Sequence, residues 1–572
     1  MMVRGDEFWV AGKRWRPVGV NYWPLYVSGM DHADYNEGWL RDRYYAPALV
    51  ECDLGHMAAM GINLVSIQTP PPREYRNLLD FLRRCARHGI YANLFVGQAS
   101  PLAFNDADLK TYIADARLAG NATVFAYDTI WEPGNHVFKD DATRSRWDAQ
   151  WRAWIGEQYG SLEKAERDWG VKARRGKDGL AVSPPDAWFR EDGEWRVQMA
   201  AYRRFMDNLT SRLWGKAHRR LRELDPNHLV SFRQGNTLPH DFALSGPVKH
   251  IDFICPEGYS IHDTDEGEDA IGFITKYVNL TTGGKPVVWS EFGMSVWDNG
   301  RMRQNPATIE KQGRYSERFY RTALAAGAEG TVPWWWPGGY RVGERSDFGI
   351  IALDRTERPA AQLIREYAPQ FQAFRKKLAP SEWFTFDRDA HAGGYWRASF
   401  NEGAAAYRAA TKAGQMLGVR TSGTGTDSAT APLVAVGNVP CDGAAPLKYF
   451  DAEFNRLEVL DADGVWREAG NGAEITVPAG QGIRVRASVG NTQEAAWRPE
   501  DVALAFRATG GNGEKLDVAR LAAKVGYLGD ADFREFKVSV KQSGAVTARM
   551  ELSRGGQAIP FGETRTFTLK SK

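Results

Sequence analysis

Residues 123–133 read TVFAYDTIWEP and place a carboxylate directly after a short apolar stretch. The first eight of these residues have the apolar, β-branched and aromatic content of a buried strand, and Glu132 stands just beyond its end. Similar stretches recur along the first part of the chain. The strand candidates are residues 17–20, 62–67, 91–96, 123–130, 229–232, 253–255, 287–289 and 330–335.

Amphipathic helices fit between these strands. Val50, Leu54 and Met57 share one helix face before Gly61. Strands that alternate with helices pair in parallel, and eight such repeats in about 370 residues predict an α/β fold of the (β/α)8 TIM-barrel type. A doubly wound open sheet is the alternative, but no strand candidate is followed by the Gly-rich phosphate turn of that fold.

The chain divides into three expected regions. Residues 1–379 form the barrel, with an N-terminal hairpin at residues 8–20 and an insertion at residues 133–227. Beyond residue 379 the helical period gives way to strand-like alternation, including residues 404–410. This pattern predicts β-sandwich domains at residues 380–489 and 490–572, the second of them immunoglobulin-like. They carry no evident catalytic residues, so they either brace the barrel or bind glycan.

Composition narrows the partners of the chain. Lys and Arg total 73 against 71 Asp and Glu, and no polybasic run argues for nucleic acid or an anionic membrane as a partner. Residues 202–222 are rich in Arg but have apolar side chains at helical spacing, which predicts an amphipathic helix with a basic outer face. The 21 Trp and 21 Tyr favour a sugar ligand, because aromatic faces pack against the C–H faces of sugar rings.

The cysteines and the N-terminus add little. Cys52, Cys85, Cys255 and Cys441 show no CxxC spacing, so we expect buried free thiols and neither a metal site nor a disulfide. No stretch approaches the roughly 20 apolar residues that span a bilayer. We expect a periplasmic or secreted protein if a leader was removed, and a cytoplasmic one otherwise. A homo-oligomer is compatible with the sequence.

A second carboxylate, Glu291, has the same placement as Glu132, directly after a strand candidate. Residues 287–293 read VVWSEFG and place Glu291 after the seventh strand candidate. Catalytic groups of TIM barrels lie at the C-terminal strand ends, and strands four and seven lie nearly across the barrel, so the two carboxyls can converge on one bond. Glycoside hydrolysis needs such a pair, because one carboxyl protonates the leaving oxygen while the other stabilises or attacks the oxocarbenium-like centre.

Four motifs give residues 8–370 a resemblance to clan A of the glycoside hydrolases. They are GVNYWP at 19–24, WEP at 131–133, SEFG at 290–293 and PWWW at 333–336. The resemblance implies a retaining enzyme that cleaves β-glycosidic bonds of an oligosaccharide or polysaccharide, with Glu132 as acid/base, Glu291 as nucleophile and no metal or organic cofactor.

The insertion carries a narrower resemblance. Its stretches YGSLE at 159–163 and WG at 169–170 are similar to those of family 42 β-galactosidases. This similarity makes an exo-acting β-galactosidase the first candidate, while β-glucosides and β-mannosides stay open as substrates.

The resemblance to clan A also implies roles around the carboxyl pair. Tyr259 matches the clan tyrosine that donates to the nucleophile, and alternation along the eighth strand selects Trp335 as the floor of the sugar subsite. Two positions depart from the clan: Trp131 stands where Asn is usual, and no Arg ends the second strand. We therefore expect Arg233 to supply the missing positive charge. The other substrate-binding candidates are Tyr22, Trp23, Gln68, Asn135, His136, Asn236, Glu257 and Trp297.

Other functions remain open at the level of sequence. An endo-acting β-glycanase or a transglycosylase would use the same two carboxyls. A non-catalytic carbohydrate-binding protein would account for the aromatic content, although a binder has no need of a matched carboxyl pair. Turnover of a glycoside separates these classes.

Overall fold

The computed structural model describes the chain in two compact units. The larger unit comprises Met1–Asp148, Val182–Gly193 and Leu209–Arg420, and the smaller one Ala149–Ala181, Glu194–Asn208 and Thr421–Lys572. Within them the described residues are 1–27, 38–70, 74–133, 140–190, 195–236, 247–259, 261–373, 379–386, 399–421, 447, 450–479, 482–492, 497–509, 514–525, 529–539 and 543–572.

The core of the larger unit is a curled, six-stranded parallel sheet in the order β4-β5-β6-β7-β8-β9. Its strands are β4 (Gly19–Asn21), β5 (Leu64–Gln68), β6 (Tyr91–Phe95), β7 (Val124–Trp131), β8 (Leu229–Asn236) and β9 (Cys255–Glu257). Each strand is followed in the sheet by the next strand of the chain. The first six strand candidates are therefore confirmed.

The last two strand candidates continue this parallel order. They form β10 (Val288–Trp289) and β13 (Gly330–Thr331), which pair with each other. A parallel bridge between Ile254 and Val287 joins the region of β9 to that of β10, and another between Val18 and Thr331 joins β13 to the residue before β4. The strand ends that carry Glu132 and Glu291 thus lie at the same edge of the parallel strands.

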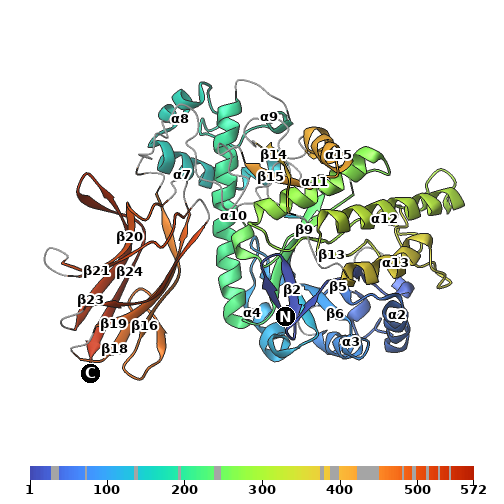
Figure 1. Ribbon diagram of the computed structural model, residues 1–572, viewed down its shortest axis with the longest axis horizontal. Helices are drawn as coiled ribbons and strands as arrows, with labels where there is room; N and C mark the ends of the chain where they lie inside the picture. The colour runs from blue at the N-terminus through green and yellow to red at the C-terminus, as the bar shows by residue number, and fades with distance from the viewer. Residues whose placement is uncertain are drawn as a thin grey trace. The chain divides into compact units, whose positions relative to one another are not determined.

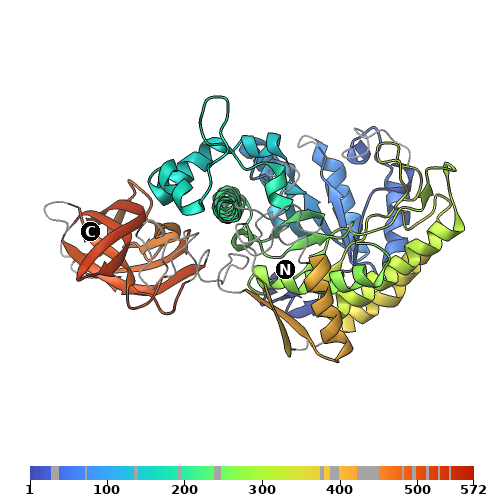
Figure 2. The same ribbon diagram turned by 90° about the horizontal axis from the view of Figure 1, so that it is seen from above.

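Helices lie outside the parallel strands of this unit (Figures 1 and 2). They include α2 (Pro47–Met60), α3 (Tyr75–Arg87), α4 (Asp106–Lys110), α11 (Asp265–Thr281), α12 (Pro306–Ala326) and α13 (Pro359–Ala373). Gly61 ends α2 and Gly327 ends α12, with φ of 84° and 91°. This left-handed conformation favours glycine, which has no Cβ to clash with the preceding turn.

A small antiparallel sheet precedes the parallel one and is formed by β1 (Met2–Arg4), β2 (Glu7–Val10) and β3 (Lys13–Trp15). Phe8 of β2 is fully buried, and its ring centroid lies 5.3 Å from those of Phe125 and of Phe253. These partners stand at the N-terminal ends of two parallel strands. The hairpin expected near residue 8 is confirmed, and it covers the end of the sheet opposite to the two glutamates.

The C-terminal part of the smaller unit consists of two sheets, in the orders β17-β16-β19-β22 and β18-β24-β23-β20-β21. Their strands are β16 (Ala452–Leu460), β17 (Trp466–Glu468), β18 (Glu474–Val477), β19 (Ile483–Asn491), β20 (Val502–Ala508), β21 (Lys515–Arg520), β22 (Asp530–Val538), β23 (Gly544–Arg554) and β24 (Gln557–Ser571). One apolar core that includes Val485, Trp497 and Phe506 serves both sheets. Strands on the two sides of the boundary expected at residue 490 therefore share sheets and a core, because β18 pairs with β24 and β19 with β22.

Part of the region expected to be a β-sandwich lies in the larger unit. It contains the paired strands β14 (Glu382–Phe386) and β15 (Leu417–Thr421) and the helix α15 (Ala404–Lys412). The strand expected at residues 404–410 is wrong. That stretch is rich in alanine, which has the highest helix propensity, and Tyr407 and Ala410 form its buried side.

The insertion is helical, with α6 (Asp141–Ser145), α7 (Asp148–Tyr159), α8 (Leu162–Trp169), α9 (Asp186–Arg190) and α10 (Arg196–Leu224). The basic outer face expected for residues 202–222 is wrong for Arg203 and Arg204, which are buried. The helix packs on more than one side, so some of its arginines lie inside; Arg204 donates from Nη1 to the carbonyl of Ala200 at 3.0 Å.

The thiols are partly as expected. Cys85 and Cys255 are free and buried, whereas Cys52 is free and exposed. The expectation of burial is wrong for Cys52 because α2 buries Val50, Asp53 and Leu54, and residue 52 falls beside that stripe. Cys441 lies outside the described residues. Within the described ranges, no helix combines the length and the apolar character needed to cross a bilayer.

Glu329, which immediately precedes β13, tests the packing at the N-terminal end of the parallel strands. Its Oε1 lies 2.9 Å from Nη2 of Arg16, and both side chains are buried. We expect Glu329→Ala to destabilise the protein by about 3–5 kcal/mol, because it leaves a buried guanidinium without its carboxylate. Thermal and urea unfolding would measure this loss.

Glu317→Ala is the matched control, since its carboxylate is half exposed and pairs with Arg321 on the surface at 3.4 Å. We expect it to change stability by less than about 0.5 kcal/mol. Equal losses in the two variants would contradict the importance of the buried pair.

Candidate active site

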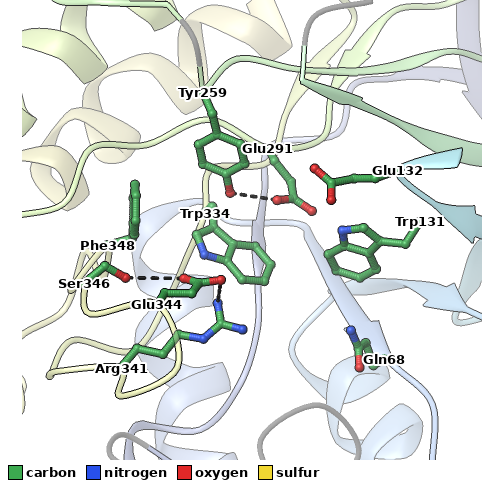
Figure 3. Close-up of a pocket in the computed structure, with 10 residues that line it drawn as sticks. All are labelled: Gln68, Trp131, Glu132, Tyr259, Glu291, Trp334, Arg341, Glu344, Ser346 and Phe348. Atoms are coloured by element: carbon green, nitrogen blue, oxygen red, sulfur yellow. Dashed lines mark hydrogen bonds and ion pairs between the residues drawn. The ribbon is translucent and has the colours of Figure 1, made fainter. Parts of the chain in front are cut away.

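A cavity of about 640 Å³ opens at the C-terminal ends of the parallel strands (Figure 3). It is lined by Gln68, Trp131, Glu132, Tyr259, Glu291, Trp334, Arg341, Glu344, Ser346 and Phe348. Gln68 ends β5, Trp131 ends β7, and Glu291 follows β10. Strand ends far apart in the sequence thus bring the two predicted catalytic glutamates, the predicted tyrosine and two predicted binding residues to one place.

Glu132 leaves β7 through an unusual backbone conformation. Its φ is 45°, in the left-handed region that non-glycine residues rarely occupy, and its N–H donates to the carbonyl of Arg233 at 3.1 Å. Such a conformation costs about 1–2 kcal/mol and persists only where the surroundings impose it. Figure 3 shows the result, a carboxyl group directed toward that of Glu291.

Glu291 is almost completely buried, with 3% of its surface exposed. The hydroxyl of Tyr259 donates to its Oε2 at 2.7 Å, and Nη1 of Arg233 donates to its Oε1 at 2.6 Å. Burial raises the pKa of Glu291 to about 7; Arg233 and Tyr259 oppose this rise, and the negative charge of Glu132 adds to it. The two donors fix the orientation of the carboxyl group and favour its ionised form.

Arg233, from β8, is completely buried and uses its donors in several directions. Its Nη1 also donates to Oδ1 of Asn21 at 2.7 Å, its Nε donates to Oδ2 of Asp128 at 3.1 Å, and its Nη2 donates to Oγ of Ser66. The guanidinium carbon lies 3.9 Å from the centre of the Trp131 ring. The side chain expected to replace the missing arginine of the second strand therefore stands beside Glu291.

Other polar residues support this network, and of these Asn93 and Asp128 were not predicted as site residues. Asn21 donates from Nδ2 to the carbonyl of Ser290 at 2.9 Å, which ties β4 to the residue before Glu291. Asn93 donates to Oδ2 of Asp128 at 2.6 Å. The sequence signal that could have indicated them is a polar side chain at a buried strand position, because such a group needs a hydrogen-bond partner inside the fold.

Glu257, at the end of β9, lies behind the cavity instead of lining it. It is fully buried and forms a parallel backbone bridge with Glu291. Burial raises the pKa of its carboxyl group well above the usual value, and the negative charges of Glu291 and Glu132 raise it further. Glu257 faces the carboxyl pair and is not among the residues that line the cavity, so its position does not give it direct contact with a substrate.

Residues of the first strand lie elsewhere than expected. Tyr22 stacks on Phe81 of α3 with ring centroids 5.7 Å apart, and its hydroxyl donates to Asp53 of α2 at 3.2 Å. It faces the helical layer, which corrects its prediction as a pocket residue. Trp23 is fully buried and supports the cavity from behind, with its ring centroid 5.4 Å from that of Trp334.

The tryptophan that lines the cavity is Trp334, not Trp335. Trp335 is stacked on Trp334 with ring centroids 5.3 Å apart and packs against Trp23. Alternation failed here because β13 ends at Thr331, so the chain is no longer a strand at these positions. Trp297, in the short strand β11 (Trp297–Asp298), packs against Tyr340 at 4.5 Å and is not among the lining residues.

One wall of the cavity was missed entirely from sequence. Arg341 and Ser346 face each other in a tight antiparallel bridge, and the N–H of Arg341 donates to the carbonyl of Ser346 at 2.7 Å. Arg341 pairs with Glu344 at 2.6 Å, and its guanidinium carbon lies 5.5 Å from the centre of the Trp334 ring. Residues 341–346 belong to no strand candidate, so only the fold brings them to the cavity.

Some predicted residues cannot be placed. Asn135 and His136 lie outside the described residues. The backbone of Asn236 ends β8 opposite Glu257, while its side chain also lies outside the description. Within the described residues, no group of three or more His, Cys, Asp or Glu is arranged to hold a metal ion.

One known protein family matches part of the chain. A family model described as Beta-galactosidase (glycoside hydrolase family 42) matches residues 103–374, just under half of the chain. The matched segment contains Glu132, Arg233, Tyr259, Glu291 and Trp334. The chain is thereby identified as a glycosidase that resembles clan A of the glycoside hydrolases. No curated protein sequence matches it.

Solved structures with the same fold include β-galactosidases. The polyextremophilic enzyme of the Antarctic haloarchaeon Halorubrum lacusprofundi has 13% sequence identity and a TM-score of 0.53, over 91% of this chain and 99% of its own. The cold-adapted enzyme of Rahnella sp. R3 has 14% identity and a TM-score of 0.51, over 96% and 86%. At this identity the likeness concerns the fold.

Tyr259→Phe tests the donor to Glu291. Because the tyrosine hydrogen bond lowers the pKa of Glu291, its loss raises that pKa. For an enzyme that needs Glu291 ionised, we expect the acidic limb of the pH profile of kcat/KM to move upward by roughly one pH unit, with kcat about tenfold lower. Steady-state kinetics between pH 4 and pH 9 on a nitrophenyl glycoside that the wild type cleaves would show this shift.

Tyr315→Phe is the matched control for this change. Tyr315 is buried and donates to the carbonyl of Gly258 at 2.9 Å, so its loss removes a comparable hydrogen bond without touching Glu291. An acidic limb that moves in Tyr315→Phe as much as in Tyr259→Phe would show that the hydrogen bond to Glu291 is not the cause.

Proposed function

We propose that the protein is a retaining hydrolase of β-glycosides, with Glu132 as acid/base and Glu291 as nucleophile. The observation that carries this proposal is the pairing of two carboxyls in one cavity, with Glu291 held by two donors. Arg233 and Tyr259 favour ionised Glu291, the state that a nucleophile needs. Glu132 lines the same cavity, and its carboxyl group is directed toward that of Glu291 (Figure 3).

The reaction would proceed by double displacement. An oxygen of Glu291 attacks the anomeric carbon as the bond to the leaving oxygen breaks, and Glu132 gives its proton to that oxygen, so that the aglycone leaves as an alcohol. Glu132, now ionised, then takes a proton from water, whose oxygen bonds to the anomeric carbon while the ester bond to Glu291 breaks. The sugar leaves with its original configuration, and both carboxyls return to their starting states.

Several residues support a small sugar subsite. Trp334 offers a flat ring to the cavity, and Gln68, Arg341 and Glu344 offer polar groups around it. Trp131 stands where the clan usually has Asn, and its ring is covered by Arg233 on one face. A contact with the sugar 2-hydroxyl would then come from another residue, for which Asn135, His136 and Asn236 remain the candidates.

We further propose that the parallel strands close into a complete (β/α)8 barrel and that the substrate is a β-galactoside. Closure is supported by the bridge between Val18 and Thr331, and by those that connect the regions of β9 and β10. The substrate is supported by the family model described as Beta-galactosidase. Cleavage from a chain end would fit a cavity of about 640 Å³, which holds few sugar units.

A panel of nitrophenyl β-glycosides, including the β-galactoside, tests this function. We expect turnover with retention, seen by NMR as the β-anomer of the first-formed sugar. Glu291→Ala should abolish turnover, and azide should restore it by giving the α-glycosyl azide. Glu132→Ala should slow turnover of unactivated substrates about 100- to 10,000-fold, and azide should give the β-glycosyl azide.

The exposed Glu310→Ala is the control and should behave as the wild type. An α-anomer as the first product would overturn the retaining mechanism. Absence of turnover across the panel and natural β-linked oligosaccharides would overturn the activity on β-glycosides.

Arg233→Lys tests whether the site needs only a positive charge at this position or the several hydrogen-bond donors of a guanidinium group. Lysine keeps the positive charge but cannot donate at once to Glu291, Asn21 and Asp128 as Arg233 does. We expect kcat/KM to fall at least about 100-fold, because a misplaced nucleophile loses its near-attack geometry. Arg318→Lys on the surface of α12 is the control and should retain wild-type kinetics. An unchanged rate in Arg233→Lys would refute the assignment.

A further inference from the structure

Glu257 is a third carboxyl group that the double displacement does not use. It is fully buried at the end of β9. The charged groups that face it come from three other elements: Glu132 after β7, Arg233 on β8 and Glu291 after β10. Among the described residues, no N–H or hydroxyl group donates to either of its carboxyl oxygens.

The charges around Glu257 do not balance if every carboxyl is ionised. Asp128, Glu132, Glu257 and Glu291 surround one cation, Arg233. Arg233 donates to the carboxylates of Asp128 and Glu291, and the carboxyl oxygens of Glu257 accept no hydrogen bond from it. An ionised carboxylate without donors is strongly disfavoured in a buried place, so the neutral acid is the form that fits there.

The titratable groups two residues before and after Glu257 in the chain do not change this count. Cys255 is buried, and burial raises the pKa of its thiol well above the usual value, so it is neutral. The pKa of Tyr259 is likewise raised well above its usual value, first by burial and then by the charge of Glu291, so it stays a neutral donor. Neither supplies the positive charge that an ionised Glu257 would need.

Glu132 is the hydrogen-bonding neighbour of Glu257. A hydrogen bond between two carboxyl groups requires a proton on one of them. Glu132 lines the cavity and is half-buried, whereas Glu257 is fully enclosed. Of the two, Glu132 is therefore the better place for a negative charge, and Glu257 the better place for the proton.

We propose that Glu257 is a positioning residue that stays protonated and donates its acid hydrogen to whichever of Glu132 and Glu291 carries the negative charge. This inference rests on the proposed function. Before attack the charge is on Glu291; after attack Glu291 is an ester and the charge is on Glu132. The net charge of the cluster stays the same in both states, and the proton of Glu257 is not consumed. Its hydrogen bond would stabilise ionised Glu132 while that group waits to accept a proton from water.

Glu257→Gln and Glu257→Leu test this role together. Gln replaces one neutral donor by another, so we expect neither limb of the pH profile of kcat/KM to move by more than about 0.3 pH units. Leu removes the donor to whichever carboxyl group is ionised, so both limbs should move upward by roughly one pH unit. The kcat for an aryl glycoside limited by deglycosylation should fall about 10- to 100-fold. The buried Glu329→Gln is the control and should move neither limb.

Two kinetic results would overturn the inference. Limbs that move downward in Glu257→Gln would show that a negative charge had been removed, hence that Glu257 is ionised in the wild type. A Glu257→Leu profile equal to that of Glu257→Gln would show that the residue only fills space.

Infrared difference spectroscopy of wild type against Glu257→Gln at neutral pH gives a test that needs neither Glu257→Leu nor turnover. We expect the wild type to show a carboxylic-acid carbonyl band that the variant lacks. A carboxylate band in its place would refute the inference. Failure of the wild type to cleave any β-glycoside would instead overturn the proposed function, whatever the infrared result.

Discussion

The buried guanidinium of Arg233 is the group on which the arrangement of the site depends. It donates to Asn21, Ser66 and Asp128 as well as to Glu291, so one side chain connects strands β4, β5 and β7 with the segment after β10. A buried charge is tolerated only when such partners are complete and well placed. The requirement to satisfy Arg233 therefore fixes the relative positions of strand ends that are distant in the sequence.

This constraint explains why the surroundings of the carboxyl pair differ from the clan pattern. The guanidinium of Arg233 comes from β8 and donates to Glu291, and its carbon lies 3.9 Å from the centre of the Trp131 ring. A tryptophan suits a position beside a guanidinium, because its face attracts a cation and carries no competing charge. The missing arginine and the unusual tryptophan are thus two parts of one arrangement.

Electrostatics and backbone geometry act together at Glu132 and Glu291. The left-handed backbone at Glu132 turns its carboxyl toward Glu291, and the network around Arg233 holds Glu291 to receive it. Bringing carboxyls together in a buried place favours protonation, and the donors Arg233 and Tyr259 oppose this effect at Glu291. Different environments for similar side chains are what allow an acid and a nucleophile to coexist at one pH.

The sequence by itself determined the positions of the eight strands and placed Glu132 and Glu291 directly after two of them, because apolar stretches and the polar residues that follow them are short-range patterns. The resemblance to clan A implied that Tyr259 lies beside Glu291, and the arginine missing from the second strand suggested Arg233 as its replacement. Only the tertiary structure decided that Trp334 lines the cavity, that Tyr22 faces the helices, that Arg341 and Glu344 form a wall, and that Glu257 lies behind the pair. The physical reason is that the direction of a side chain in a loop, and its burial at a strand end, depend on which distant parts of the chain pack against it. A local periodic pattern in the sequence does not encode those contacts.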